Sequence, residues 1–339
     1  MLLQPSAVKK IAIFRALQLG DMLCAVPAIR ALHHAFPDAK ITLLGLPWAT
    51  SFVNRFNQYI QEFKWFPGFP GLPEQPFKAD ETLRFLHEMN EEKFDLILQM
   101  QGNGAIVNPL IPLMGSTISA GFCKADDYCP DTNLYLLYPE GIHEKDRHLR
   151  LMDNLGIPRH GDEMEFPLFP QDEIELQLSG IDLRAGSYVC IHPGSRGTWR
   201  QWPPAFFAML GDVCTKNGKT VVLTGTNDEL EIVQRVANKM QSKPIIAAGK
   251  TSLGAMSVLL RDAYALISNC TGPAHIAAAL RTPTVVISMD GEPVRWTHVY
   301  DKIHFALDWT TNPDLDLAIS ATEQLLAQDL IRFADDALA

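Results

Sequence analysis

The sequence predicts an α/β protein with two doubly wound domains in tandem, and three observations support this prediction. Strand-like apolar runs alternate with helical patterns in two series, which begin near residues 9 and 187. The runs are too continuously apolar for a sheet with one wet face, so each sheet should be parallel and covered by helices on both faces. Between the series, residues 139–180 break the alternation. This break gives two expected domains, residues 1–175 and 176–339.

The elements of the first series follow from the hydrophobic period and from Gly and Pro. Strands are expected at 9–16, 40–47 and 94–100, and helices at 20–37, 48–60, 79–93 and 148–158. An apolar helical stretch should follow the glycine turn at Gly102 and Gly104. Residues 62–77, rich in Pro, Gly and Phe, are expected to form a loop, and residues 163–175 an extended linker.

The second series is more regular. Strands are expected at 187–194, 219–226, 244–250, 264–270 and 282–290, and helices at 202–218, 227–240, 252–263, 271–281 and 314–339. The last of these leaves room for C-terminal helices that pack back on the first domain. Two doubly wound domains suggest a cleft between them, with ligands at the carboxyl ends of the strands.

Composition excludes several classes of function. The chain has 39 acidic and 29 basic residues and a net charge of −10, which argues against broad binding to nucleic acid or to an anionic membrane. The six cysteines form no CxxC pair and are expected to be reduced, mostly buried thiols; Cys123 and Cys129 are close in sequence but lack further metal ligands. No signal peptide and no run of 18 apolar residues is present. We therefore expect a cytoplasmic protein with at most peripheral contact at the inner face of the membrane.

A Gly-Asp pair, Gly20 and Asp21, directly follows the first strand. The glycine is expected to let the backbone turn sharply into the helix. Asp21 then lies at a helix N-terminus, which favours its ionised form. An isolated acid there is a cap or first-turn acid. At the carboxyl end of a strand it could also accept a proton from a hydroxyl group.

The loop at 192–203, HPGSRGTWRQWP, joins a strand to a helix and carries small residues and two cations. Such a loop can offer N–H groups and a positive charge to a diphosphate. The alternative is an ordinary surface loop with solvated arginines. Arg200 is the better candidate of the two arginines, because Pro203 fixes the helix start just beyond it.

Two further segments join strands to helices. In 225–229, GTNDE, the acids either favour the helix dipole or hold ribose hydroxyls. In 268–280, SNCTGPAHIAAAL, Gly272 would let a phosphate approach the helix N-terminus closely. His275 lies one turn after Thr271 on the same helix face, either as a binding residue or as an ordinary packed histidine. Walker, HExxH, GxSxG and glycine-rich dinucleotide motifs are missing.

These four segments, in this order, resemble the ADP-heptose:lipopolysaccharide heptosyltransferases, which form glycosyltransferase family 9. The matching residues are Gly20-Asp21, His192 to Gly194 with Arg200 to Pro203, Gly225 to Glu229, and Cys270 to His275. The resemblance implies the GT-B fold, in which two Rossmann-like domains face a central cleft. The first domain would bind a saccharide or glycolipid acceptor, and the second a nucleotide sugar, with an ADP-sugar favoured.

The resemblance also implies an inverting transfer without metal or other cofactor. Asp21 would be the general base, and Arg200 would neutralise the leaving diphosphate. The residues expected to bind the donor are Gly20, Ser195, Glu229, Cys270, Thr271, Gly272 and His275. Among these, Glu229 would hold the ribose, Thr271 and Gly272 the phosphates, and His275 would support their loop.

Two positions depart from the family's pattern. Arg200 stands where the family usually has Lys, and Cys270 where it has Asp. A thiol cannot accept hydrogen bonds as a charged carboxylate does. The departure leaves two alternatives to a transferase open: a nucleotide-sugar-binding protein without catalysis, and a nucleotide-sugar epimerase of the same fold.

Overall fold

The computed structural model describes residues 3–297 and 303–328, and the chain divides into two compact units. Unit 1 is Met1–Pro167 and unit 2 is Leu168–Ala339. The division therefore falls earlier than residue 175, where the sequence placed it. The reason is that the helix after Pro167 packs within unit 2, as described below.

Unit 1 is a six-stranded parallel sheet with the strand order β3-β2-β1-β4-β5-β6. Its strands are β1 (Lys10–Phe14), β2 (Lys40–Gly45), β3 (Glu62–Trp65), β4 (Leu96–Gln99), β5 (Ile118–Cys123) and β6 (Tyr135–Leu137). Its helices are α1 (Leu19–Ala35), α2 (Ala49–Arg55), α3 (Ala79–Glu92) and α4 (Glu144–Asn154), with short 3₁₀ helices η1 (Pro5–Ala7) and η2 (Ile111–Met114).

Unit 2 repeats this arrangement, with the strand order β12-β11-β10-β7-β8-β9 and parallel pairing throughout. Its strands are β7 (Tyr188–His192), β8 (Thr220–Leu223), β9 (Ile245–Ile246), β10 (Ala265–Asn269), β11 (Thr284–Ser288) and β12 (His304–Asp308). Its helices are α5 (Pro170–Leu178), α6 (Pro204–Lys216), α7 (Leu230–Ala237), α8 (Leu253–Asp262), α9 (Gly272–Ala279), α10 (Pro293–Trp296) and α11 (Leu315–Leu326), with 3₁₀ helices η3 (Thr198–Arg200) and η4 (Asn227–Glu229).

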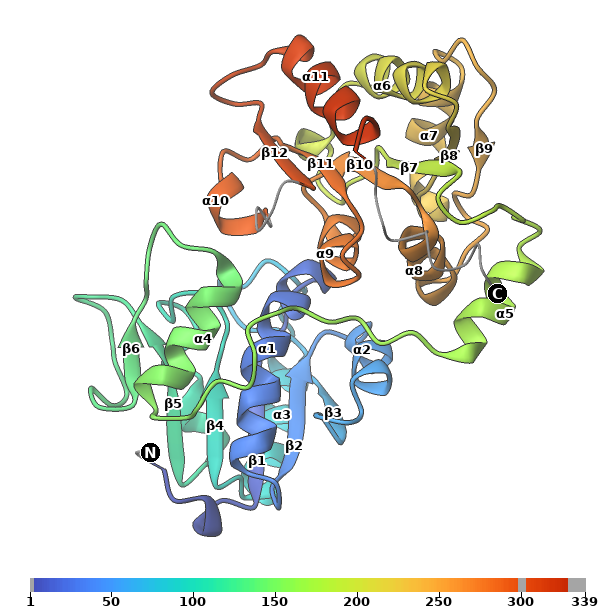
Figure 1. Ribbon diagram of the computed structural model, residues 1–339. Helices are drawn as coiled ribbons and strands as arrows, with labels where there is room; N and C mark the ends of the chain where they lie inside the picture. Colours follow the sequence, from blue (N-terminus) through green and yellow to red (C-terminus); the bar gives the residue numbers. More distant parts are fainter. Residues whose placement is uncertain (1–2, 298–302, 329–339) are drawn as a thin grey trace. The chain divides into compact units, whose positions relative to one another are not determined.

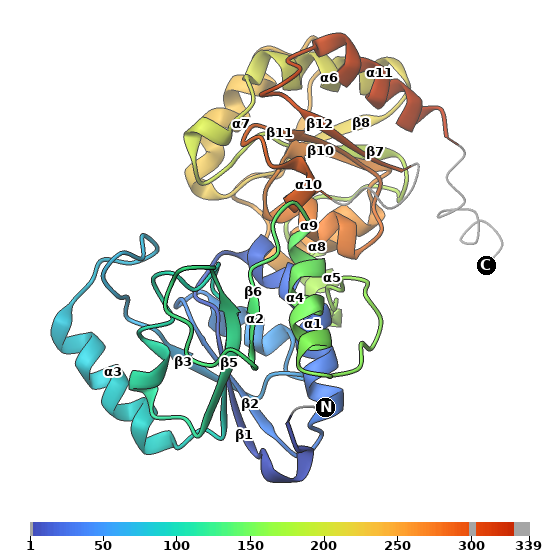
Figure 2. The ribbon, with the colours of Figure 1, turned by 90° about the vertical axis from the view of Figure 1, so that its left-hand side faces the viewer.

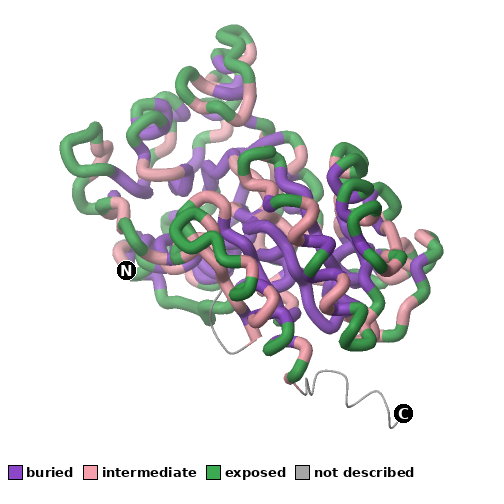
Figure 3. The backbone as a smooth tube through the Cα atoms, turned by 90° about the horizontal axis from the view of Figure 1, so that it is seen from above, coloured by how far each residue is buried: buried purple, intermediate pink, exposed green. Residues whose placement is uncertain are grey.

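Helices cover both faces of each sheet, as the continuously apolar strands predict. In unit 1, α1 and α4 lie side by side on one face and α3 lies on the other (Figures 1 and 2). In unit 2, α6, α7 and α11 cover one face, and α8 and α9 the other (Figure 2). The central strands β1, β4, β7 and β10 are almost wholly buried. Figure 3 colours the backbone by burial and shows buried and exposed segments along the chain. The predicted class, two parallel-sheet α/β domains, is confirmed.

Several local predictions are wrong, each for a physical reason. The extended linker at 163–175 contains helix α5, because Pro170 suits the first helical position and the Asp172 carboxylate accepts from the Phe169 amide at 2.8 Å. This helix packs against α8 of the same unit, where Glu173 pairs with Arg261 at 2.6 Å. The helix expected after Gly104 is limited to η2 and turns.

Three further elements differ from the prediction in their type, start or packing. The expected loop at 62–77 begins with strand β3, a half-buried edge strand with little apolar signal. The helix expected from residue 227 begins at Leu230, because residues 227–229 form the 3₁₀ helix η4. In η4 the Thr226 amide donates to the Glu229 carboxylate at 2.8 Å. Helix α11 packs against α6 within unit 2, and residues 329–339 of the expected C-terminal helix lie outside the described residues.

The shared strand order fixes where a ligand can bind. In an open parallel sheet the crevice lies at the carboxyl ends of the strands where the order reverses. That point lies between β1 and β4 in unit 1 and between β7 and β10 in unit 2. The Gly-Asp pair follows β1, and two of the other segments follow β7 and β10. Three of the four predicted segments therefore flank a reversal point of their own sheet.

In the described part of the chain, no helix combines the length and the apolar character needed to cross a bilayer.

Candidate functional site

Asp21 lies in the first turn of α1, just beyond the end of β1. Its Oδ2 accepts a hydrogen bond from the Gln18 amide at 3.3 Å, so the predicted role as a first-turn acid is confirmed. The side chain is partly exposed. Gly20 is buried within the same turn with helical backbone angles, so the sharp turn expected at Gly20 is wrong; the chain turns before Leu19. Asp21 thus caps the first turn of α1 and is partly exposed as a residue.

A buried arginine fixes the turn that carries Asp21. The Arg15 side chain has no exposed surface, and its Nε and Nη2 donate to the Asp21 carbonyl oxygen at 3.1 and 2.8 Å. Its Nη1 donates to the carbonyl of Met100, which follows β4. One guanidinium therefore bonds to the backbone on both sides of the reversal point of unit 1.

The charge of Arg15 is balanced by helix α4. Glu144 is buried, with Oε1 at 3.3 Å from Arg15 Nη2 and at 3.3 Å from His148 Nε2. Glu144 Oε2 also accepts from Arg147 Nη1, and Arg147 Nε donates to the Pro139 carbonyl at 2.9 Å. The four side chains, Arg15, Glu144, Arg147 and His148, are called the unit 1 charge cluster below.

The titration of the unit 1 charge cluster predicts how stability depends on pH. Burial, followed by the charge of Arg15, lowers the pKa of His148 to about 4 from 6.5. The unfolded chain therefore binds a proton that the folded chain does not, and stability is lost as pH falls from 6.5 to 4, by at most about 3 kcal/mol. The free energy of unfolding, measured by urea titration across this window, should fall for the wild type and stay flatter for His148→Gln. His87→Gln, at an exposed histidine, serves as the control and should follow the wild type. Equal slopes for all three proteins would contradict the prediction.

In unit 2, the loop after β7 is not an ordinary surface loop. The last residue of β10, Asn269, is fully buried and donates from Nδ2 to the carbonyls of Pro193 and Gly194 at 2.8 and 3.2 Å. Its Oδ1 accepts from the amide of the buried Trp202 at 2.9 Å. Ser195 is buried as well, and its carbonyl accepts from Gln201 Nε2 at 3.0 Å. Asn269 thereby fastens both ends of the loop to the neighbouring strand.

Glu229 lies beside the start of the same loop. Its Oε2 is 3.7 Å from His192 Nε2, and a side chain at Gly194 would collide with its carboxyl group. Burial lowers the pKa of His192, and its Nδ1 is 3.1 Å from Thr224 Oγ1. The absence of a side chain at Gly194 is therefore what lets the Glu229 carboxylate lie against this loop.

Arg200 reaches the end of β11. Its guanidinium carbon lies 4.8 Å from the Trp199 ring centroid, and its Nη2 is 3.3 Å from Asp290 Oδ2. Cys270 is buried nearby, at the end of β10, and burial, with a smaller effect of Asp290, raises the pKa of its thiol to about 12. Cys270 is thus an uncharged thiol. Arg196, in contrast, is exposed as an ordinary surface arginine.

Helix α9 begins between these groups. Thr271 precedes it in extended conformation, and its buried Oγ1 has no hydrogen-bond partner among the described residues. Gly272 is the first helical residue. His275 is buried and packs edge-on to Trp296, with ring centroids 6.2 Å apart. The donor-binding residues predicted in unit 2 therefore surround the carboxyl ends of β7, β8 and β10.

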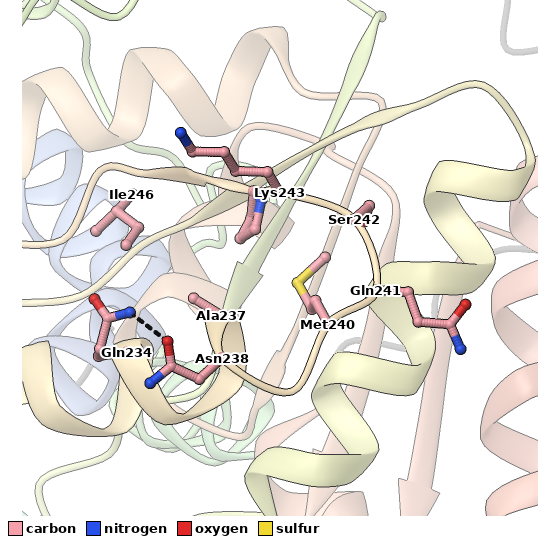
Figure 4. Close-up of a pocket in the computed structure, with 9 residues that line it drawn as sticks. Gln234, Ala237, Asn238, Met240, Gln241, Ser242, Lys243 and Ile246 are labelled. Atoms are coloured by element: carbon pink, nitrogen blue, oxygen red, sulfur yellow. Dashed lines mark hydrogen bonds between the residues drawn. The ribbon is translucent and has the colours of Figure 1, made fainter.

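One surface pocket, of about 360 Å³, lies away from these segments. Its walls come from the end of α7 and the connection to β9, including Gln234, Asn238 and Lys243 (Figure 4). Because this connection precedes β9, the pocket lies at the amino end of that strand, opposite to the predicted ligand edge. Within 3–297 and 303–328, no group of three or more His, Cys, Asp or Glu side chains is placed to hold a metal ion.

Sequence reasoning missed the residues that connect the segments. Asn269 lies inside the predicted segment 268–280, but its bonds to the loop after β7 depend on strand pairing. Asp290 ends an expected strand and was assigned no role. Arg15 and Glu144 are 129 residues apart, so no local pattern joins them.

The sequence model of glycosyltransferase family 9 (heptosyltransferase) matches residues 82–320, more than half of the chain. The chain belongs to this family. An Escherichia coli relative named lipopolysaccharide heptosyltransferase 3 is 26% identical over 291 residues, which cover 82% of each chain. The family 9 protein is thus a glycosyltransferase, which confirms the resemblance drawn from the four segments.

Solved structures agree on the fold of this family 9 glycosyltransferase. A family 9 glycosyl transferase from Veillonella parvula has a TM-score of 0.76 and 20% identity, covering 94% of this chain and 97% of its own. The Escherichia coli ADP-heptose lipopolysaccharide heptosyltransferase II has a TM-score of 0.70 and 18% identity, covering 95% and 99%. The predicted GT-B class is thereby confirmed.

Proposed function

We propose that this glycosyltransferase moves a heptose from ADP-heptose to a saccharide acceptor of lipopolysaccharide, with inversion at the anomeric carbon and without a metal ion. The observation that carries the proposal is the convergence of the segments after β7, β8 and β10 at the ligand edge of unit 2. The names of the relatives support the sugar and the acceptor class, and the name of the E. coli structure supports the ADP donor.

Unit 2 would bind the donor with the residues gathered at that edge. Thr271 Oγ1 and the first amide groups of α9 would bind the diphosphate, because a helix N-terminus favours an anion. Glu229 would accept hydrogen bonds from the ribose hydroxyls. His275 would support the start of α9 from inside, as its burial beside Trp296 suggests. Ser195 would shape the loop through its backbone, since its side chain is buried.

Asp21 would act as the general base in unit 1, and Gly20 beside it would contact the donor. Its carboxylate would accept the proton of the attacking acceptor hydroxyl, whose oxygen forms the new bond to the anomeric carbon. The bond from that carbon to the diphosphate oxygen breaks at the same time, and the electron pair leaves with ADP. Attack opposite to the leaving group inverts the configuration.

Arg200 would supply the positive charge that the departing diphosphate needs. A guanidinium is always charged and can bind two phosphate oxygens at once, which suits this role without a metal ion. Its contact with Asp290 holds the side chain at the end of β11, on the same edge as α9. Arg200 would therefore supply a positive charge at a fixed position, in the role that a bound metal ion would otherwise have.

An assay with defined substrates tests the proposal. Purified protein is given ADP-heptose and a heptose-deficient lipopolysaccharide core, and ADP release and the anomeric configuration of the product are measured. We expect acceptor-dependent ADP release, an inverted product by NMR, and no loss of rate with EDTA. UDP- and GDP-sugars serve as donor controls. Donor binding without turnover would favour a binding protein, and a changed sugar still attached to its nucleotide would favour an epimerase.

A further inference from the structure

Asp290 is a buried carboxylate with an incomplete set of hydrogen bonds. It lies two residues after β11, and its side chain is 4% exposed. Its Oδ1 accepts from Ser288 Oγ at 2.7 Å and from the Glu292 amide at 3.2 Å. Its Oδ2 has an ionic contact with Arg200 Nη2 at 3.3 Å but receives no hydrogen bond from the described residues. A buried charged oxygen without a hydrogen bond is costly, and a bound ligand is one way to satisfy it.

Two polar groups near Asp290 also have unused hydrogen-bonding capacity. Arg200 Nε and Thr271 Oγ1 are buried, and neither has a hydrogen-bond partner in the described part of the chain. Two donors and one acceptor of the protein therefore remain unused at the adjoining ends of β10 and β11 and the loop after β7. The thiol of Cys270 lies next to them and adds no charge.

The chemistry of Oδ2 selects the ligand group. A phosphate has only acceptor oxygens when fully ionised, so it cannot satisfy a carboxylate and would be repelled by it. A hydroxyl can donate to the Asp290 carboxylate and accept from a guanidinium at the same time. On a nucleotide sugar, the groups that fit are the hydroxyls of the sugar, beside a diphosphate bound by α9.

We propose that Asp290 binds a hydroxyl of the sugar that is transferred, and that it also positions Arg200. The proposal rests on the proposed function and names a specificity residue for it. The position that resembles the family's Asp is Cys270 here, so the carboxylate at this edge comes from the neighbouring strand instead. Donor recognition would then depend on a residue outside the four segments that the sequence singled out.

Binding of ADP and of ADP-heptose to the wild type and to Asp290→Asn tests the proposal by calorimetry. ADP lacks the sugar, and the asparagine side-chain oxygen can still accept from Arg200, so the affinity for ADP should be unchanged or somewhat higher once the negative charge is gone. ADP-heptose should lose about 10-fold or more in affinity, because a hydrogen bond to a charged group is lost. Glu292→Gln is the matched control: it removes the same charge from the same loop, but this carboxylate already pairs with Arg295 at 3.2 Å. The control should keep the wild-type ratio of the two affinities.

A second measurement separates recognition from a purely structural role. ADP-sugar analogues that each lack one hydroxyl are bound to the wild type, and one of them should lose about 10-fold in affinity. Asp290→Asn should not distinguish that analogue from the parent sugar. If Asp290→Asn does not fold, Asp290→Glu takes its place, since it keeps the charge and shifts the carboxylate.

The outcomes are distinct. Equal losses for ADP and ADP-heptose, or no loss for either, would overturn the role of Asp290 while leaving the proposed function intact. The role of Asp290 is also overturned if the wild type binds ADP-heptose no more tightly than ADP. A wild type that binds no ADP-sugar at all contradicts the proposed function, and the role of Asp290 falls with it.

Discussion

Asp21→Asn is expected to lower kcat by about 10²- to 10⁴-fold, because the amide cannot accept the proton of the acceptor hydroxyl. The affinity for ADP should stay unchanged, since the side chains proposed to bind the donor belong to unit 2. Acceptor-dependent ADP release gives kcat, and calorimetry gives the affinity. A mutant with full activity would eliminate the assignment of the base.

The substitution should leave the fold intact. An asparagine oxygen can still accept from the Gln18 amide, as Asp21 Oδ2 does at 3.3 Å. Asp172→Asn is the matched control, because Asp172 accepts from the Phe169 amide in the same way at the start of α5. If loss of a capping carboxylate were enough to reduce kcat, this variant would show the same loss. We expect it to retain wild-type activity and similar stability.

The sequence predicted candidate site residues where these directly follow a strand that can be recognised from its own local pattern. Parallel strands such as β7 and β10 are buried on both faces, so they form continuous apolar runs that are easily recognised. The segments that follow them carry Gly and Pro for local backbone reasons. Asp21, Arg200 and Thr271 could therefore be placed at strand ends without a structure. Their functional roles remain predictions.

Residues that act over long sequence distances could not be found in this way. Arg15 ends an ordinary apolar run, and only the pairing of β1 with β4 brings it to Met100. Asp290 gains its importance from Arg200, which approaches it from another loop. Edge elements were missed for a different reason: β3 is half-buried and short, so it carries little hydrophobic pattern. Hydrophobic periodicity shows which residues of a strand are buried. It does not show which strands lie side by side, because the topology of the sheet sets the pairing.

Glu144→Gln is expected to destabilise unit 1 by about 3–5 kcal/mol, because it leaves Arg15 and Arg147 buried without their counter-charge. The side chains of Glu144 and Arg147 are each 2% exposed, and that of Arg15 is 0% exposed, so water cannot replace the lost carboxylate. Urea unfolding followed by circular dichroism measures the change. Glu163→Gln is the control: Glu163 is 61% exposed and lies 3.9 Å from Arg30, so its loss should cost no more than about 1 kcal/mol.

A double substitution shows whether charge is the cause. In Arg15→Met with Glu144→Gln, one cation and the anion are removed together, and Arg147 keeps its bond to the Pro139 carbonyl. The double variant should therefore be destabilised by less than the sum of the two single variants. Strict additivity would mean that the two residues stabilise unit 1 by packing alone. Coupling would show instead that the turn carrying Asp21 is held by a charge on α4, so that this buried ion pair also fixes the proposed base.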